Sequence, residues 1–154
     1  MKAHLHPTPR IKIGHEIARA GFATAMIDIS DGLAGDLYHI CTRSDVGAVI
    51  DQLRLPLPEH IEQIESLSGM SSIQMVLHSG EDYELLFTVA SDTPIEEIEA
   101  IGNEFRIPIR EIGRIIPKNE GYYLVDAREK QIPIHPRGWD HFEESVANDG
   151  GNKG

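Results

Sequence analysis

Two carboxylates and a hydroxyl stand close together where an apolar run gives way to a helical pattern. Asp28 follows the apolar residues 25–27, and Ser30 and Asp31 come shortly after it. Carboxylate oxygens suit a hard cation such as Mg²⁺, which commonly bridges carboxylates to phosphates. The spacing across a strand-to-helix turn lets Asp28 and Asp31 face one point. The chemistry that these residues could support is therefore metal-assisted binding of phosphates.

The same residues also have a simpler explanation. Ser and Asp are favoured helix N-caps, so Ser30 or Asp31 is expected to cap the following helix. From spacing alone, a capping turn is the more common explanation. Asp28 fits it less well, because it directly follows an apolar run and begins no helix of its own. A carboxylate at that position needs a partner or a metal if it is buried. Both interpretations stay open at this point.

A second acidic stretch precedes another apolar run. Glu81, Asp82 and Glu84 lie directly before residues 85–89, which are predicted to form a buried strand. A solvated turn explains these acids about as well as a binding site does. The sequence contains no glycine-rich phosphate loop of either common type and no Cys/His cluster of zinc spacing. Any chemistry would therefore lie at the two acidic stretches.

The surrounding pattern predicts helices packed on a mixed sheet, an α+β fold. Helices are expected over residues 11–20, 31–43, 59–67, 71–77 and 94–105. Strands are expected over residues 23–28, 48–51, 85–89, 110–116, 122–126 and 131–134. Residues 118–121 are predicted to form a hairpin turn. In domain terms, residues 1–10 are interpreted as a linker, 11–142 as one domain and 143–154 as a disordered tail.

Composition excludes some classes of function. The 154-residue chain carries a formal net charge of -11, which argues against a general nucleic-acid or anionic-membrane surface. It has no apolar run long enough to cross a bilayer and no signal peptide. The single cysteine, Cys41, lies on the apolar face of a predicted helix and is interpreted as a buried residue of a cytoplasmic protein.

Three motifs in order resemble the thiamine-monophosphate kinase family. They are residues 25–33 with Asp36 and Leu37, residues 80–87, and the run Gly-Trp-Asp-His-Phe at residues 138–142. The resemblance covers essentially the whole chain but only the C-terminal half of the family's protein. It implies the α/β/α-layered C-terminal domain of the aminoimidazole ribonucleotide synthetase-like type. It also makes residues 1–10 the linker from a missing N-terminal domain.

The resemblance also implies an activity and roles for individual residues. The activity is ATP-dependent phosphorylation of thiamine monophosphate to thiamine diphosphate, with no catalytic side chain needed. Asp28 and Asp31 would bind Mg²⁺, Ser30 would contact the ATP phosphates, and Glu81 and Trp139 would contact thiamine monophosphate. Without the resemblance, Trp139 is equally well explained as a residue of the core. The fragment is expected to be inactive without the N-terminal domain, and the family's homodimer is expected only with it. The alternative is a non-catalytic ligand-binding or assembly module.

Overall fold

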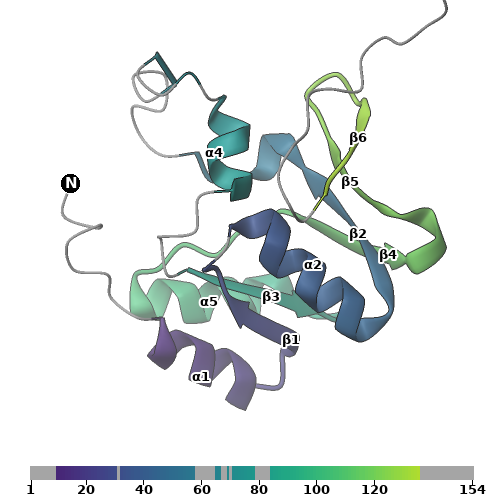
Figure 1. Cartoon of the computed structure of the whole chain (residues 1–154). Helices are drawn as coiled ribbons and strands as arrows, with labels where there is room; N and C mark the ends of the chain where they lie inside the picture. The colour runs from purple at the N-terminus through teal and green to yellow at the C-terminus, as the bar shows by residue number, and fades with distance from the viewer. Residues whose placement is uncertain are drawn as a thin grey trace, which may run out of the picture.

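The computed structural model describes residues 10–30, 32–57, 65–66, 69, 71–78 and 84–135. The helical elements within these residues are α1 (Ile11–Arg19), α2 (Leu33–Ser44), α4 (Ser72–His78), α5 (Ile95–Phe105) and the short 3₁₀ turns η1 (Gln52–Arg54) and η2 (Lys118–Glu120). The strands are β1 (Ala23–Asp28), β2 (Val46–Asp51), β3 (Leu85–Val89), β4 (Gly113–Pro117), β5 (Tyr122–Val125) and β6 (Gln131–Pro133). The α+β class predicted from the sequence is confirmed (Figure 1). The helix predicted over residues 59–67 lies almost wholly outside the described residues.

The described strands form two sheets. One is mixed and runs in the order β4-β2-β5-β6, with β2 and β5 parallel and the other neighbours antiparallel. The other is an antiparallel pair of β1 and β3. The mixed sheet was predicted from the sequence, whereas its separation from the β1–β3 pair was not. None of the described helices is long and apolar enough to cross a membrane.

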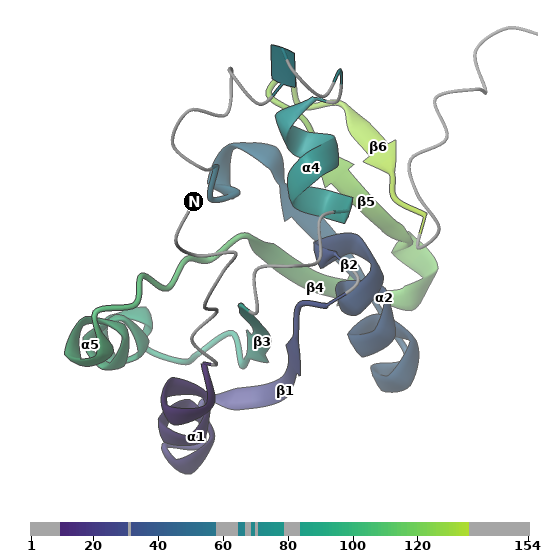
Figure 2. The same cartoon turned by 60° about the vertical axis from the view of Figure 1, so that its left-hand side comes forward.

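Helix α2 packs against strands of both sheets, namely β1 and β3 of the pair and β2 of the mixed sheet (Figures 1 and 2). Its inner face buries the residues that the helical spacing predicted to be apolar contacts, namely Leu33, Leu37, Ile40 and Cys41. They pack with side chains of β2, β3, β5 and α4 in one hydrophobic core. Burial raises the pKa of the Cys41 thiol, so Cys41 behaves as a core residue rather than as a nucleophile.

Helix α1 covers the other face of the β1–β3 pair. A Cβ added at Gly14 would come within 2.8 Å of Leu85 Cδ1 and 3.3 Å of Met26 Sδ. Met26 therefore faces α1, while its neighbours Ala25 and Ile27 pack against the main core. This alternation is the usual one for a strand with helices on both faces. The β1–β3 pair is thus fixed from two sides.

A polar contact ties the mixed sheet to the start of α2. The hydroxyl of Tyr122, the first residue of β5, donates a hydrogen bond to the carbonyl oxygen of Ala34. The ring of Tyr122 also lies against that of Tyr38, with centroids 5.8 Å apart. Burial raises the pKa of Tyr122, which keeps the hydroxyl protonated and able to donate. The first turn of α2 is therefore held by the neighbouring sheet as well as by its own helix.

The prediction of a hairpin turn at residues 118–121 is wrong. These residues form η2 and Gly121, and the strands on either side of them do not pair with each other, because β2 lies between them. The connection passes over the beginning of β2, where the Ala48 N–H donates to the Gly121 carbonyl oxygen at 3.2 Å. A Cβ at Gly47 would collide with that same carbonyl. Glycine at position 47 therefore allows the crossing.

Candidate functional site

The residues of the first acidic stretch lie at the carboxyl end of β1, next to the start of α2. Asp28 is the last residue of β1, and both Asp28 and Ser30 are exposed. Asp28 lies opposite Leu85, the first residue of β3, in the antiparallel register. The end of β1 is therefore beside the beginning of β3. This geometry brings the beginning of the first acidic stretch, at Asp28 and Ile29, next to Glu84, the last acid of the second stretch.

The two stretches are joined by a backbone hydrogen bond. The N–H of Ile29 donates to the carbonyl oxygen of Glu84 at 2.8 Å, which extends the β1–β3 pairing by one bond. The carboxylate of Glu84 in turn accepts two hydrogen bonds from Arg10, the residue directly before α1. Three segments that are far apart in the sequence therefore meet at this strand end.

A buried carboxylate holds the turn after β1. Asp36 lies in the first turn of α2, is 2% exposed, and accepts a hydrogen bond from the Ser30 N–H at 2.8 Å. Asp36 is the one buried charged residue in the part of the chain that the structure describes. A buried carboxylate is tolerated where it is well hydrogen-bonded. Asp36 thereby fixes the backbone of Ser30 without using the Ser30 hydroxyl.

The prediction that Ser30 or Asp31 caps α2 is wrong. The N-cap is Gly32, with φ of 93°, a conformation that favours glycine. A Cβ at Gly32 would approach the Leu77 carbonyl oxygen to 2.6 Å and the His78 Cα to 2.8 Å. The close approach of α4, together with the positive φ, therefore requires glycine at this N-cap position. The capping explanation for Ser30 is removed, because the N-cap position is occupied by Gly32, two residues later.

Of the five predicted site residues, the structure describes two. Asp28 and Ser30 lie together at the end of β1, with both side chains accessible to a ligand. Asp31, Glu81 and Trp139 lie outside the described residues. Among the residues that are described, no group of three or more His, Cys, Asp or Glu side chains is placed to hold a metal ion. The carboxylate of Asp28 offers the hard oxygen ligands that Mg²⁺ prefers, so this side chain fits the ion.

Sequence reasoning missed two contributors to this strand end. Asp36 carried a usable signal, since it is an acidic residue within the apolar, inward-facing pattern that Leu33 and Leu37 begin. A charge in such a place is expected to have a specific partner. The pairing of Arg10 with Glu84 carried no such signal, because these residues are far apart in the chain and each is of an ordinary surface type.

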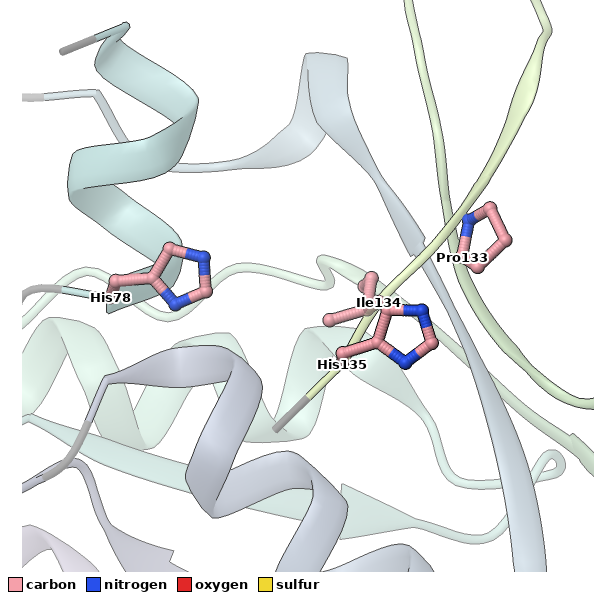
Figure 3. Close-up of a pocket in the computed structure, with 4 residues that line it drawn as sticks. All are labelled: His78, Pro133, Ile134 and His135. Carbon is pink, nitrogen blue, oxygen red and sulfur yellow. The ribbon is translucent and has the colours of Figure 1, made fainter. Parts of the chain in front are cut away.

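Beside the start of α2, a small cavity lies between the end of α4 and the end of β6 with the two residues that follow it. It is lined by His78, Pro133, Ile134 and His135 (Figure 3). The Nε2 atom of His78 is buried and has no hydrogen-bond partner among the described residues. Burial lowers the pKa of His78 from its ordinary value of 6.5. The imidazole is therefore kept neutral more strongly in the folded chain than in the unfolded chain.

A pH dependence of stability follows from His78. Because the unfolded chain takes up this proton at a higher pH, the free energy of unfolding should fall as the pH decreases below about 6.5. The fall should end once the folded protein is itself protonated at the lowered pKa. Urea unfolding between pH 7.5 and 5 measures this slope, and His78→Gln should reduce it. His39→Gln, at an exposed position of α2 outside this cavity, is the matched control and should keep it. An unchanged slope in His78→Gln would contradict the prediction.

Comparisons with known proteins show the family to which the chain belongs. Residues 2–126 match the family model described as AIR synthase related protein, C-terminal domain. A thiamine-monophosphate kinase from Buchnera aphidicola (subspecies Acyrthosiphon pisum) is 34% identical over 143 residues, which cover 93% of this chain and 42% of the relative. The chain thus spans about two fifths of the length of the curated relatives that it matches.

Solved structures show the same fold. The structure of AaThiL complexed with AMPPCP and TMP matches with a TM-score of 0.65 and 35% identity, covering 92% of this chain and 40% of that one. The hydrogenase maturation protein HypE of E. coli matches with a TM-score of 0.69, covering 82% of this chain and 39% of that one, but it is only 14% identical and supports the fold alone. The chain belongs to the AIR synthase related protein, C-terminal domain family, and is homologous to the C-terminal region of thiamine-monophosphate kinases.

Proposed function

We propose that this chain is the C-terminal half of a cytoplasmic thiamine-monophosphate kinase, which phosphorylates thiamine monophosphate to thiamine diphosphate with ATP. The observation that carries the proposal is the strand end formed by Asp28 and Ser30. It is exposed, its backbone is fixed by Asp36, and it lies beside the start of β3. An exposed carboxylate and hydroxyl on a fixed backbone are suited to binding ions and phosphates.

Asp28 and Asp31 are proposed to hold Mg²⁺ through their carboxylate oxygens. Bound there, Mg²⁺ would neutralise phosphate charge and orient the phosphates for transfer. Neutralisation of the phosphate charge is needed because the chain carries a net charge of -11 and both proposed reactants are anionic. Two carboxylates alone do not complete the coordination of Mg²⁺. Further oxygen ligands would come from the phosphates, from water and from the N-terminal domain of the family's protein.

The remaining residues are proposed to bind the two substrates. The hydroxyl of Ser30 would donate to an ATP phosphate, and Glu81 and Trp139 would contact thiamine monophosphate. A tryptophan face is a favourable partner for a cationic thiazolium ring. The structure of a relative with AMPPCP and TMP supports the ligand classes, because AMPPCP is a nucleoside triphosphate analogue and TMP fits a thiamine-monophosphate kinase. Since the acceptor phosphate is already ionised near pH 7, no protein nucleophile or strong base is assigned.

The chain is proposed to need its N-terminal domain for turnover. It spans about two fifths of its relatives' length, so most of a complete kinase would be contributed from elsewhere. Homodimer formation is likewise expected only with that domain. Alone, the chain should bind Mg²⁺-nucleotide weakly. The alternative function is a non-catalytic ligand-binding or assembly module of the same family.

A hybrid enzyme tests the proposal. The chain replaces the matching 42% of a thiamine-monophosphate kinase such as that of Escherichia coli K12, which is 37% identical over the matched region. Thiamine diphosphate formation from ATP and thiamine monophosphate is then measured by chromatography. The proposal predicts Mg²⁺-dependent product. A folded hybrid that binds thiamine monophosphate without forming product would instead favour the non-catalytic module. Robust turnover by the isolated chain would contradict the need for a second domain.

A further inference from the structure

Glu84 connects three segments at the strand end that carries Asp28 and Ser30. Its carboxylate accepts from Arg10 Nε at 3.0 Å and from Arg10 Nη2 at 2.7 Å. Its backbone carbonyl accepts the Ile29 N–H at 2.8 Å. Glu84 is therefore hydrogen-bonded to the segment before α1 through its side chain and to the end of β1 through its backbone.

The geometry of the Arg10–Glu84 pair is better suited to fixing the position of the Glu84 segment than to stabilising the folded chain. Two parallel hydrogen bonds from one guanidinium fix the direction of a carboxylate as well as its distance. The side chains are 27% and 45% exposed, and ion pairs of such exposure contribute little to stability. The pair joins residues 74 positions apart and is expected to add little stability, which favours a positioning role.

We propose that Arg10 and Glu84 are positioning residues that hold the end of β1 so that Asp28 and Ser30 face their ligands. Neither side chain is assigned a contact with substrate. The pair acts on the Ile29 peptide through the Glu84 backbone, and on the neighbouring Asp28 and Ser30 through Ile29. The inference depends on the proposed function only for the identity of the ligands. The physical coupling from Arg10 to the Ile29 amide can be tested on this chain alone.

Hydrogen exchange of single amides, measured by NMR on the full chain, tests this coupling. In Arg10→Ala the Ile29 amide should exchange about tenfold faster, while the Ile27 amide, which belongs to the next hydrogen-bonded pair with Leu86, should be unchanged. Arg10→Lys should give an intermediate rate, because lysine cannot make the two parallel bonds. The swapped pair, Arg10→Glu with Glu84→Arg, should bring the exchange rate of the Ile29 amide most of the way back to that of the starting protein. The matched control is Arg54→Ala, which removes an exposed pair with Glu111 elsewhere on the surface and should leave Ile29 unchanged.

A kinetic measurement separates positioning from a merely structural role. In the hybrid enzyme, Arg10→Ala should lower kcat about tenfold while the melting temperature stays within about 3 °C, as expected for a weakly stabilising pair. The swapped pair should recover most of kcat. An Ile29 exchange rate that is the same with and without Arg10 would overturn the proposal, and so would a loss of kcat that simply follows a loss of melting temperature. A hybrid without any activity would overturn the proposed function instead, and the exchange rate would still decide the coupling.

Discussion

Asp28→Asn should lower thiamine diphosphate formation by the hybrid enzyme at least about 100-fold. The substitution keeps the size of the side chain at the exposed end of β1 and removes the charge that is proposed to bind Mg²⁺. A metal ion that neutralises transferring phosphates contributes several kcal/mol to the rate, and each 1.36 kcal/mol is about tenfold. Stability should change by less than about 0.5 kcal/mol, because the residue is exposed.

Initial rates over a Mg²⁺ titration measure this effect. The half-saturating Mg²⁺ concentration should rise along with the loss of rate, and Asp31→Asn should behave in the same way. Asp92→Asn is a suitable control, because Asp92 is also exposed but follows the opposite end of β3. A hybrid in which Asp28→Asn retains the starting rate would remove Asp28 from the proposed metal site.

Asp36→Ala should reduce the free energy of unfolding by about 2 kcal/mol, as expected when a hydrogen bond to a buried charged group is lost. The Ser30 N–H then loses its acceptor, and the turn between β1 and α2 is no longer fixed. Supporting residues of metal sites typically affect metal affinity or activity by about 10–100-fold. Activity in the hybrid should therefore fall within that range as well.

Asp36→Asn separates the hydrogen bond from the charge. Its amide oxygen can still accept from Ser30, so it should retain more stability and more activity than the alanine variant. Urea unfolding and initial rates are the two measurements. If both variants lose activity equally while unfolding like the starting protein, the charge of Asp36 rather than its hydrogen bond would be what matters.

Much of the local structure could be predicted from the sequence. The strand over residues 23–28 and the strand over residues 85–89 have the predicted bounds. The helical spacing of Leu33, Leu37 and Ile40 correctly identified the buried face of α2. These features are encoded in short stretches, where apolar periodicity and turn residues are sufficient signals.

The features that could not be predicted from the sequence depend on contacts between segments that are distant in the chain. The N-cap of α2 is Gly32 rather than Ser30 or Asp31, and α4 lies too close to Gly32 to leave room for a side chain there. The hairpin expected at residues 118–121 failed because a local turn signal does not say which strand will lie next to which. For the candidate site, the sequence correctly placed Asp28 and Ser30 at the end of the first strand, and their metal and phosphate roles stay predictions. It could not reveal that Asp36 fixes Ser30 from within the core.

The order of strands in the mixed sheet has a consequence for biosynthesis. β2 lies between β4 and β5, and Ile50 pairs with Gly113 and with Leu124. When β2 leaves the ribosome, both of its neighbours are still untranslated. Pairing of such separated segments is slow, and an unpaired apolar strand is prone to associate with other chains. A nascent chain of this protein should therefore depend on chaperones until residue 125 has emerged, and a truncation before Gly113 should aggregate.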